Sequence, residues 1–261
     1  GCPITPPVLR ALKGWIPVKT LTCDLSGDGR VTLTAYLYEP SARMPDFSLR
    51  PAVLIFPGGG YYGQTDREKE PVAAAFVSQG YHAFVLCYSV GPEHCFEEAL
   101  ADADAALALL RRNAEEWNLD PHRIAVCGFS AGGHLAAAAG TLGKQRADAL
   151  ILAYPCILAG MSNILAFPVP SLNEAVTPQT PPAFLFHTRT DACVPVENSL
   201  RFADALDRNG VPFEMHIFRE GPHGLSLATP QTASGNPDMI NPDAAKWVDL
   251  CLAWLDGLFK M

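Results

Sequence analysis

The chain has 261 residues, 49% of them hydrophobic and 18% charged, and its formal net charge at pH 7 is −8. This composition favours a folded protein with a large core over a disordered chain. The acidic excess argues against nucleic acid or an anionic membrane surface as a partner, and no apolar stretch is long enough for a transmembrane helix.

The first 50 residues predict an irregular start followed by a hairpin. Residues 1–17 are rich in proline and are expected to lie along the surface. Residues 19–24 and 31–38 are β-prone and flank the sequence Ser26-Gly27-Asp28-Gly29. Such a pattern is typical of an antiparallel β-hairpin.

Beyond residue 50, short apolar runs alternate with amphipathic stretches. The apolar runs predict buried strands at 52–56, 83–87, 124–127, 149–153, 183–187 and 213–218. The amphipathic stretches predict helices at 68–79, 95–117, 131–142, 196–209 and 243–259. The alternation predicts an α/β fold in one domain over residues 1–261, with a mostly parallel, doubly wound sheet and the hairpin at its N-terminal edge.

One segment interrupts this alternation. Residues 155–182 contain six prolines and are expected to form a loop or a small helical lid, with the lid-like insertion at about 157–180. In parallel sheets, reactive groups gather at the carboxyl ends of the strands. Candidate site residues should therefore come directly after the predicted strands.

Ser130 stands in such a place, within the sequence Gly128-Phe-Ser-Ala-Gly132. This G-x-S-x-G spacing follows the strand at 124–127 and precedes the helix at 131–142, which is the context of a nucleophilic serine on a tight strand-to-helix turn. The small glycines allow the strand and the helix to approach closely. The alternative is an ordinary turn in which the serine caps the helix.

A serine nucleophile needs a base to take its proton and an acid to orient that base. Asp191 is the first carboxylate after the strand at 183–187, and His223 follows the strand at 213–218 within a glycine-rich loop. A turn aspartate and an exposed loop histidine are the alternatives for these two residues. Asp204 and Asp207 also follow the serine, but their amphipathic helix predicts that they face solvent.

A tetrahedral intermediate needs amide donors where its oxygen becomes negative. Residues 56–63, FPGGGYYG, follow the strand at 52–56, and the three glycines let backbone N–H groups turn into the site. The amide of Ala131, directly after the serine, is the second expected donor. A phosphate-binding loop is the alternative, but neither the P-loop nor the G-x-G-x-x-G pattern is present.

Three further residues are candidates for substrate contact. Tyr61 and Tyr62 follow the glycine loop and could stack on a sugar or an aromatic acyl group, with packing beneath the lid as the alternative. His134 lies one helical turn after the serine and either lines the pocket or packs against the loops. The histidines and cysteines lack the spacing of a zinc site, so neither a metal nor another cofactor is expected.

With these residues in place, the sequence resembles the α/β-hydrolase superfamily. More narrowly it is similar to small bacterial esterases of the acetyl esterase and hormone-sensitive-lipase-like group, including those assigned to acetylated xylan. Five stretches carry the resemblance in order: PGGGYYG from 57, GFSAGGHLA from 128, TPQTPPAFLFHTRTDACVPVENS from 177, FADALDRNGVPFEMHIF from 202 and GPHGLSLA from 221.

The resemblance assigns a role to each candidate. It implies Ser130 as nucleophile, His223 as base and Asp191 as acid, with oxyanion amides from Gly59, Gly60 and Ala131. One position departs from the pattern, because Pro57 stands where the related H-G-G-G sequence has a supporting histidine. We therefore expect the oxyanion loop to be braced differently in this chain.

The function implied is that of a serine carboxylesterase acting on short-chain, chiefly acetyl, esters, on a small molecule or on an oligosaccharide such as acetylated xylan. The alternatives are a prolyl-oligopeptidase-like exopeptidase and a non-catalytic hydrolase-fold binding protein. No nucleic-acid or membrane partner is expected, and monomer and homodimer both stay open.

Eight cysteines without a C-x-x-C pair favour free thiols over disulfides. Cys87, Cys127, Cys156 and Cys251 lie in apolar runs and are expected to be buried. A cytoplasmic location follows as the expectation, with a removed signal peptide as the alternative.

Overall fold

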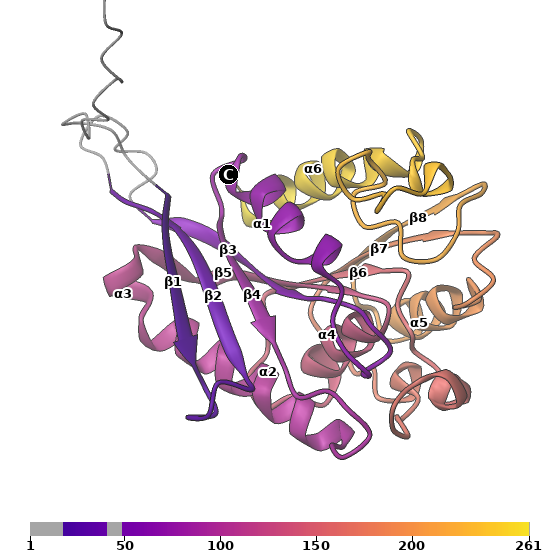
Figure 1. The fold of residues 1–261 in the computed structure, drawn as a ribbon, viewed down its shortest axis with the longest axis horizontal. Coiled ribbons are helices and arrows are strands. Elements are labelled where there is room, and N and C mark those ends of the chain that lie inside the picture. Colours follow the sequence, from indigo (N-terminus) through magenta and orange to yellow (C-terminus); the bar gives the residue numbers. More distant parts are fainter. Residues whose placement is uncertain (1–17, 41–48, 261) are drawn as a thin grey trace, which may run out of the picture.

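The structure is a computed structural model and describes residues 18–40 and 49–260, so the surface segment predicted at 1–17 lies outside it. The described residues form an eight-stranded sheet in the order β1-β2-β4-β3-β5-β6-β7-β8 (Figure 1). Its strands are β1 (Val18–Asp24), β2 (Thr32–Tyr38), β3 (Arg50–Phe56), β4 (His82–Cys87), β5 (Leu119–Phe129), β6 (Ala149–Ala153), β7 (Ala183–Thr188) and β8 (Phe213–Phe218).

The predicted hairpin is present at one edge of this sheet. Strand β1 pairs only with β2, and β2 runs antiparallel to both β1 and β4, while the other neighbours are parallel. The Asp24 carboxylate shapes the connection by accepting hydrogen bonds from the amides of Ser26, Gly27 and Gly29. The predicted α/β architecture with an antiparallel N-terminal pair is thus confirmed.

Helices cover both faces of the sheet (Figure 1). One face carries α1 (Glu70–Val77) and α6 (Trp247–Phe259), and the other carries α2 (Phe96–Arg112), α3 (Ala114–Trp117), α4 (Ala131–Thr141) and α5 (Glu197–Arg208). Each face buries its own cluster of apolar side chains against the strands. The central strands are buried on both sides, which explains their continuous apolar runs.

Three predicted helices begin or break differently in the structure. The helix predicted from residue 68 begins at Glu70 as α1, and Glu68 instead ends the short 3₁₀ helix η2 (Asp66–Glu68). The long helix predicted at 95–117 breaks at Asn113, whose side chain donates to the Leu109 carbonyl. The last predicted helix starts as the 3₁₀ helix η6 (Ala244–Lys246) before α6.

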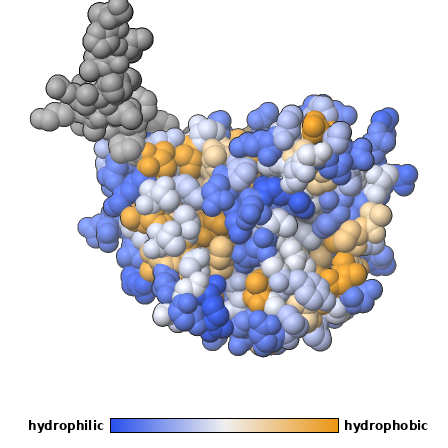
Figure 2. All heavy atoms as spheres, viewed as in Figure 1, coloured by the Kyte–Doolittle hydropathy of each residue, from blue (hydrophilic) through white to orange (hydrophobic). Residues whose placement is uncertain are grey.

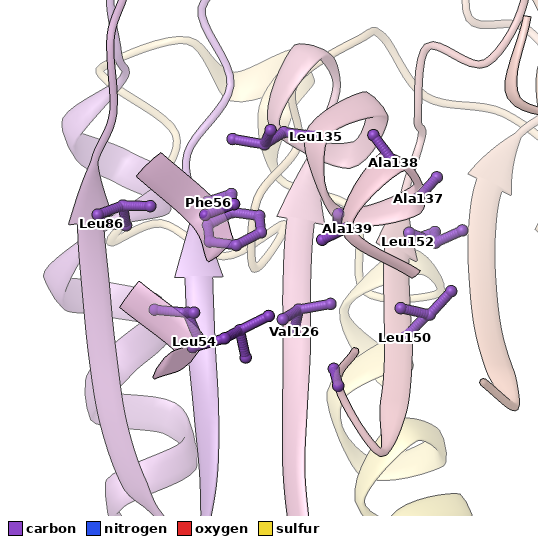
Figure 3. Close-up of a cluster of buried hydrophobic side chains, with 14 of the residues drawn as sticks. Leu54, Phe56, Leu86, Val126, Leu135, Ala137, Ala138, Ala139, Leu150 and Leu152 are labelled. Atoms are coloured by element: carbon purple, nitrogen blue, oxygen red, sulfur yellow. The ribbon is translucent and has the colours of Figure 1, made fainter. Parts of the chain in front are cut away.

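Helix α4 packs unusually close to the sheet because its residues are small. Figure 3 shows Leu135, Ala138 and Ala139 of this helix against side chains of β3, β5 and β6. A side chain at Gly132 would collide with the Phe56 carbonyl, and one at Gly128 would collide with the Gly132 carbonyl. These two glycines therefore allow the start of α4 to approach β3 and β5 closely.

Residues 157–180 contain two 3₁₀ helices, η3 (Ala159–Ile164) and η4 (Leu172–Glu174). Their apolar side chains join the cluster on the α4 face. The Ala166 amide donates to the Gly60 carbonyl at 2.9 Å, which ties the segment to the glycine loop. On the face seen in Figure 2 most of the surface is hydrophilic, with hydrophobic residues in separate groups.

Candidate active site

Ser130 lies between the end of β5 and the first residue of α4. Its backbone has φ 54° and ψ −116°, a conformation that non-glycine residues rarely adopt. Three backbone hydrogen bonds hold it: its amide donates to the Ala153 carbonyl, and its carbonyl accepts from the amides of His134 and Cys156. The turn keeps the hydroxyl at the carboxyl edge of the sheet.

The structure brings Ser130, His223 and Asp191 together in a chain of hydrogen bonds. His223 Nε2 lies 2.7 Å from Ser130 Oγ, and His223 Nδ1 lies 2.6 Å from Asp191 Oδ2. Because an ionised carboxylate only accepts, Nδ1 carries the proton and Nε2 is left to accept from the serine hydroxyl. These side chains come from the ends of three different strands, β5, β7 and β8.

Asp191 is held in its charged form. Burial by itself raises the pKa of this carboxyl, but hydrogen bonds from His187, His223 and the Val194 amide outweigh it and hold the pKa well below its usual 3.8. The amides of Cys193 and Val194 each donate to Oδ1 at 2.9 Å. His187, which is fully buried, lies 3.4 Å from Oδ2 and has no assigned role in the sequence pattern.

The glycine loop after β3 reaches the same edge of the sheet. Gly59 and Gly60 have φ 142° and 66° and line the pocket in front of Ser130. In the described chain, the amides of Gly59, Gly60 and Ala131 donate to no other backbone or side-chain group. Three unused amides near one hydroxyl form an arrangement that can accept a negative oxygen.

The loop is braced by groups that the sequence pattern did not identify. The Tyr88 hydroxyl donates to the Pro57 carbonyl at 2.5 Å, and the Gly58 amide donates to Glu68 Oε2 at 2.7 Å. Glu68 is 1% exposed. The expectation of a different brace at Pro57 is met by a tyrosine and a buried carboxylate in place of a histidine.

A pocket of about 170 Å³ opens beside Ser130 and His223. One part of its wall is apolar or sulfur-bearing, from Cys156, Ile164, Leu165 and Cys193, and the other part is polar, from Thr65, Arg67 and Glu68. A more open groove of about 460 Å³ lies beyond His223 and is lined by Thr190, Ala192, Cys193, Gly221, Pro222 and Asp238 as well as by the histidine itself.

Two of the three residues proposed for substrate contact have no exposed surface. Tyr61 and His134 are 0% exposed, and the Tyr61 hydroxyl lies 3.1 Å from His134 Nδ1. Both side chains follow the alternative given for them and pack against residues 157–180, Tyr61 against Phe167 and His134 through a hydrogen bond to the Pro170 carbonyl. Tyr62 is exposed, but its hydroxyl donates to the Leu165 carbonyl and it is not among the pocket-lining residues.

The cysteines are free thiols throughout the described chain. Cys127, Cys156 and Cys251 are buried as predicted, whereas Cys87 is only partly buried because it lies at the end of β4. Burial raises the pKa of the Cys156 thiol to about 12. Cys156 lines the pocket. It lies three residues after the end of β6, so the expectation that site residues directly follow strands could have identified it.

Residues 18–40 and 49–260 contain neither a metal-binding cluster nor a membrane-spanning helix. No three His, Cys, Asp or Glu side chains lie together in a way that could hold a metal ion. No helix there combines the length and the apolar character needed to cross a bilayer.

Comparison with known proteins identifies the family. Two family models match, BD-FAE over residues 37–156 and the prolyl oligopeptidase family over residues 166–234. An α/β-hydrolase enzyme from a Medee basin deep-sea metagenome library has a TM-score of 0.89 and 40% identity, covering 95% of this chain and 100% of its own. An acetyl ester-xyloside bifunctional hydrolase from Caldicellulosiruptor lactoaceticus has a TM-score of 0.77 and 33% identity, covering 94% and 98%. The chain belongs to the α/β-hydrolase superfamily.

Curated relatives match over part of their length. An acetylxylan esterase of Xylanibacter ruminicola is 28% identical over 234 residues, which are 81% of this chain and 47% of that protein. Endo-1,4-beta-xylanase B of Butyrivibrio fibrisolvens is 33% identical over 238 residues, which are 78% of this chain and 36% of that protein. The chain thus spans less than half the length of these two relatives.

Proposed function

We propose that this protein is a serine carboxylesterase that removes short acyl groups, acetyl in particular, from a carbohydrate or another small alcohol. The observation that carries the proposal is the hydrogen-bond chain from Ser130 through His223 to Asp191, with distances of 2.7 and 2.6 Å. Relatives described as a carboxylesterase of Lactobacillus plantarum, an acetylxylan esterase and an acetyl ester-xyloside hydrolase support the same class.

In the proposed reaction Ser130 Oγ attacks the ester carbonyl while His223 Nε2 takes its proton. The carbonyl oxygen becomes negative and is held by the amides of Gly59, Gly60 and Ala131. His223 then gives the proton to the leaving alcohol, and the acyl group stays on the serine. Water, deprotonated by the same imidazole, releases the acid and restores the hydroxyl.

The two cavities support a small acyl group and a larger alcohol. The pocket of about 170 Å³ lies well below the ~300–1,000 Å³ of sites for drug-sized ligands. The groove of about 460 Å³ is open and shares His223 with the pocket. Since His223 must protonate the leaving alcohol, we place the acyl group in the pocket and the alcohol along the groove.

Removing the hydroxyl of Ser130 tests its proposed role as nucleophile. Ser130→Ala should abolish labelling by a fluorophosphonate probe and lower kcat for p-nitrophenyl acetate at least ~10³-fold, because it removes the hydroxyl that is hydrogen-bonded to His223 Nε2. Ser78→Ala, at an exposed position after α1, is the matched control and should match the unsubstituted protein. Undiminished labelling of Ser130→Ala would refute the proposed nucleophile.

Substrate class is tested by varying each half of the ester. We expect rates on p-nitrophenyl esters to fall as the acyl chain lengthens from acetate to octanoate, and acetate to be released from acetylated xylo-oligosaccharides. A peptidase is the second candidate, because the prolyl oligopeptidase model matches residues 166–234. Hydrolysis of Gly-Pro-p-nitroanilide faster than that of p-nitrophenyl acetate would favour it.

A further inference from the structure

Glu68 is a buried carboxylate that the proposed reaction does not use. It is 1% exposed and accepts three hydrogen bonds: from the Gly58 amide at 2.7 Å, the Thr65 hydroxyl at 2.8 Å and the Tyr154 hydroxyl at 2.7 Å. A buried charge costs free energy unless hydrogen bonds compensate it, and bonds to an ionised acceptor are the strong ones. Such an arrangement fixes its donors in place.

The first of these donors belongs to the loop that carries the oxyanion amides. Gly58 directly precedes Gly59, so the bond from its amide to Glu68 sets the direction of the chain at the start of the loop. The packing there is tight, because a side chain at Gly58 would lie 2.9 Å from Glu68 Oε2 and 3.0 Å from Ser130 Cβ. Gly58 therefore borders both the Glu68 carboxylate and Ser130.

The Tyr154 hydroxyl connects the same carboxylate to the loop of His223. This hydroxyl also accepts from the Ser226 amide at 2.8 Å, and the Tyr154 ring meets the His223 ring edge-on with centroids 5.1 Å apart. Arg67, beside Glu68, adds a second link, because its Nε donates to the Gly224 carbonyl at 2.8 Å. The segment directly after His223 is thus attached to the short helix η2 at two residues, Gly224 and Ser226.

We propose that Glu68 is a positioning residue, which aligns the oxyanion amides and the His223 loop with Ser130 by holding Gly58 and Tyr154. This inference rests on the proposed esterase function. Glu68 touches neither reacting atom in this role and acts through its two partners. It serves as the brace of a glycine loop that lacks the histidine of related sequences at Pro57.

Two substitutions separate the parts of this role. Glu68→Ala removes both links and should lower kcat about 100-fold, comparable to losing one oxyanion donor. Glu68→Gln keeps an oxygen that can accept from Gly58 and Thr65, but its NH₂ group cannot accept from Tyr154. We expect a loss on the order of 10-fold for this variant, since the loop link survives. Glu70→Gln, two residues away on the exposed side of α1, is the matched control.

The measurement must distinguish misalignment from misfolding. Active sites are titrated with a fluorophosphonate, and kcat and KM for p-nitrophenyl acetate are expressed per titrated site. Misalignment lowers kcat per site and the rate of fluorophosphonate labelling while KM changes less than about 3-fold. A purely structural role would lower the number of active sites and leave kcat per site unchanged.

The outcomes separate this inference from the proposed function. If the unsubstituted protein reacts with the probe and both Glu68 variants react at its rate, the positioning role is wrong and the esterase proposal stands. If the unsubstituted protein neither hydrolyses esters nor labels at Ser130, both proposals fail. Should Glu68→Ala not fold, Glu68→Gln and Tyr154→Phe decide, because each removes the hydrogen bond between Tyr154 and Glu68. A kcat per site equal to that of the unsubstituted protein in both variants would overturn the inference.

Discussion

At the scale of single residues, the environment of Asp191 determines which ring nitrogen of His223 carries the proton. The carboxylate accepts two backbone amides on Oδ1 and the His223 ring on Oδ2. Because these bonds favour the charged form and hold the pKa low, the carboxylate stays a hydrogen-bond acceptor at neutral pH. His223 is therefore kept in the tautomer that can accept the Ser130 proton.

Asp191→Asn should leave the geometry intact but disturb this tautomer, because the amide nitrogen can present a donor to Nδ1. We expect kcat for p-nitrophenyl acetate to fall ~10³–10⁴-fold at pH 7, the loss known for this change in a serine–histidine–aspartate site. Asp204→Asn on α5 is the control, since its carboxylate pairs with Arg208 at the surface. A loss below 10-fold for Asp191→Asn would argue against the assigned acid.

At the scale of secondary-structure elements, the contact between β5 and α4 is the most constrained. The turn at Ser130 has positive φ, and no side chain fits at Gly128 or Gly132. The Phe56 carbonyl, which Gly132 faces, belongs to the strand that leads into the glycine loop. The approach of α4 thus determines the spacing between the serine and the loop.

Two glycine substitutions test this constraint in opposite directions. Gly132→Ala should lower the free energy of unfolding by at least ~1–3 kcal/mol, because the added methyl overpacks the contact with Phe56. Gly257→Ala in α6, where a methyl meets nothing within 4 Å, should raise it by roughly 0.5–1 kcal/mol through helix propensity. Urea denaturation of both variants provides the measurement, and equal stabilities would contradict the close approach.

At the scale of the whole molecule, two buried histidines link stability to pH. His134 accepts from Tyr61 and donates to the Pro170 carbonyl, while His82 accepts from the Tyr38 amide. Burial lowers the pKa of each ring to about 4, and for His82 the charge of Arg50 adds to the effect. Both rings are therefore neutral in the folded protein and take up a proton more readily when it unfolds.

Because unfolding allows these two histidines to bind protons, acidification should destabilise the folded protein. Between pH 6.5, the pKa of a histidine in the unfolded chain, and pH 4, its approximate pKa in the folded protein, the unfolded chain binds more protons than the folded protein. The stability that the neutral ring contributes is therefore fully present above this range and is lost as the pH falls through it. Between pH 7 and 5 we expect a loss on the order of 2 kcal/mol per histidine. His134→Gln should remove about half of the decrease in urea denaturation, whereas His122→Asn, at the surface, serves as the control. A decrease of unchanged size in His134→Gln would refute the assignment.

Several parts of the molecule follow from local sequence. Periodicity predicts the parallel strands and their order of appearance, because a strand buried on both faces must be apolar throughout. Glycine spacing predicts the turn at Ser130, because only small residues fit where β5 meets α4. The strand-end rule then selects Asp191 and His223 as candidates, and the structure places both within hydrogen-bonding distance of their neighbours.

Other features depend on which distant segments of the chain come into contact, and local sequence patterns do not predict those contacts. The sequence pattern predicts Glu68 as the first residue of an amphipathic helix. In the structure it is buried, because Gly58 and Tyr154 approach it from the ends of β3 and β6. For Tyr61 the sequence left substrate contact and packing beneath the lid as alternatives, and only the structure shows its ring buried against Phe167. The sequence alone determined the fold class and the residues able to do chemistry, since both depend on periodicity and local sterics. The tertiary structure alone decided which groups brace the loop and which line the pocket, because burial and hydrogen bonding between distant residues arise only once the sheet has assembled.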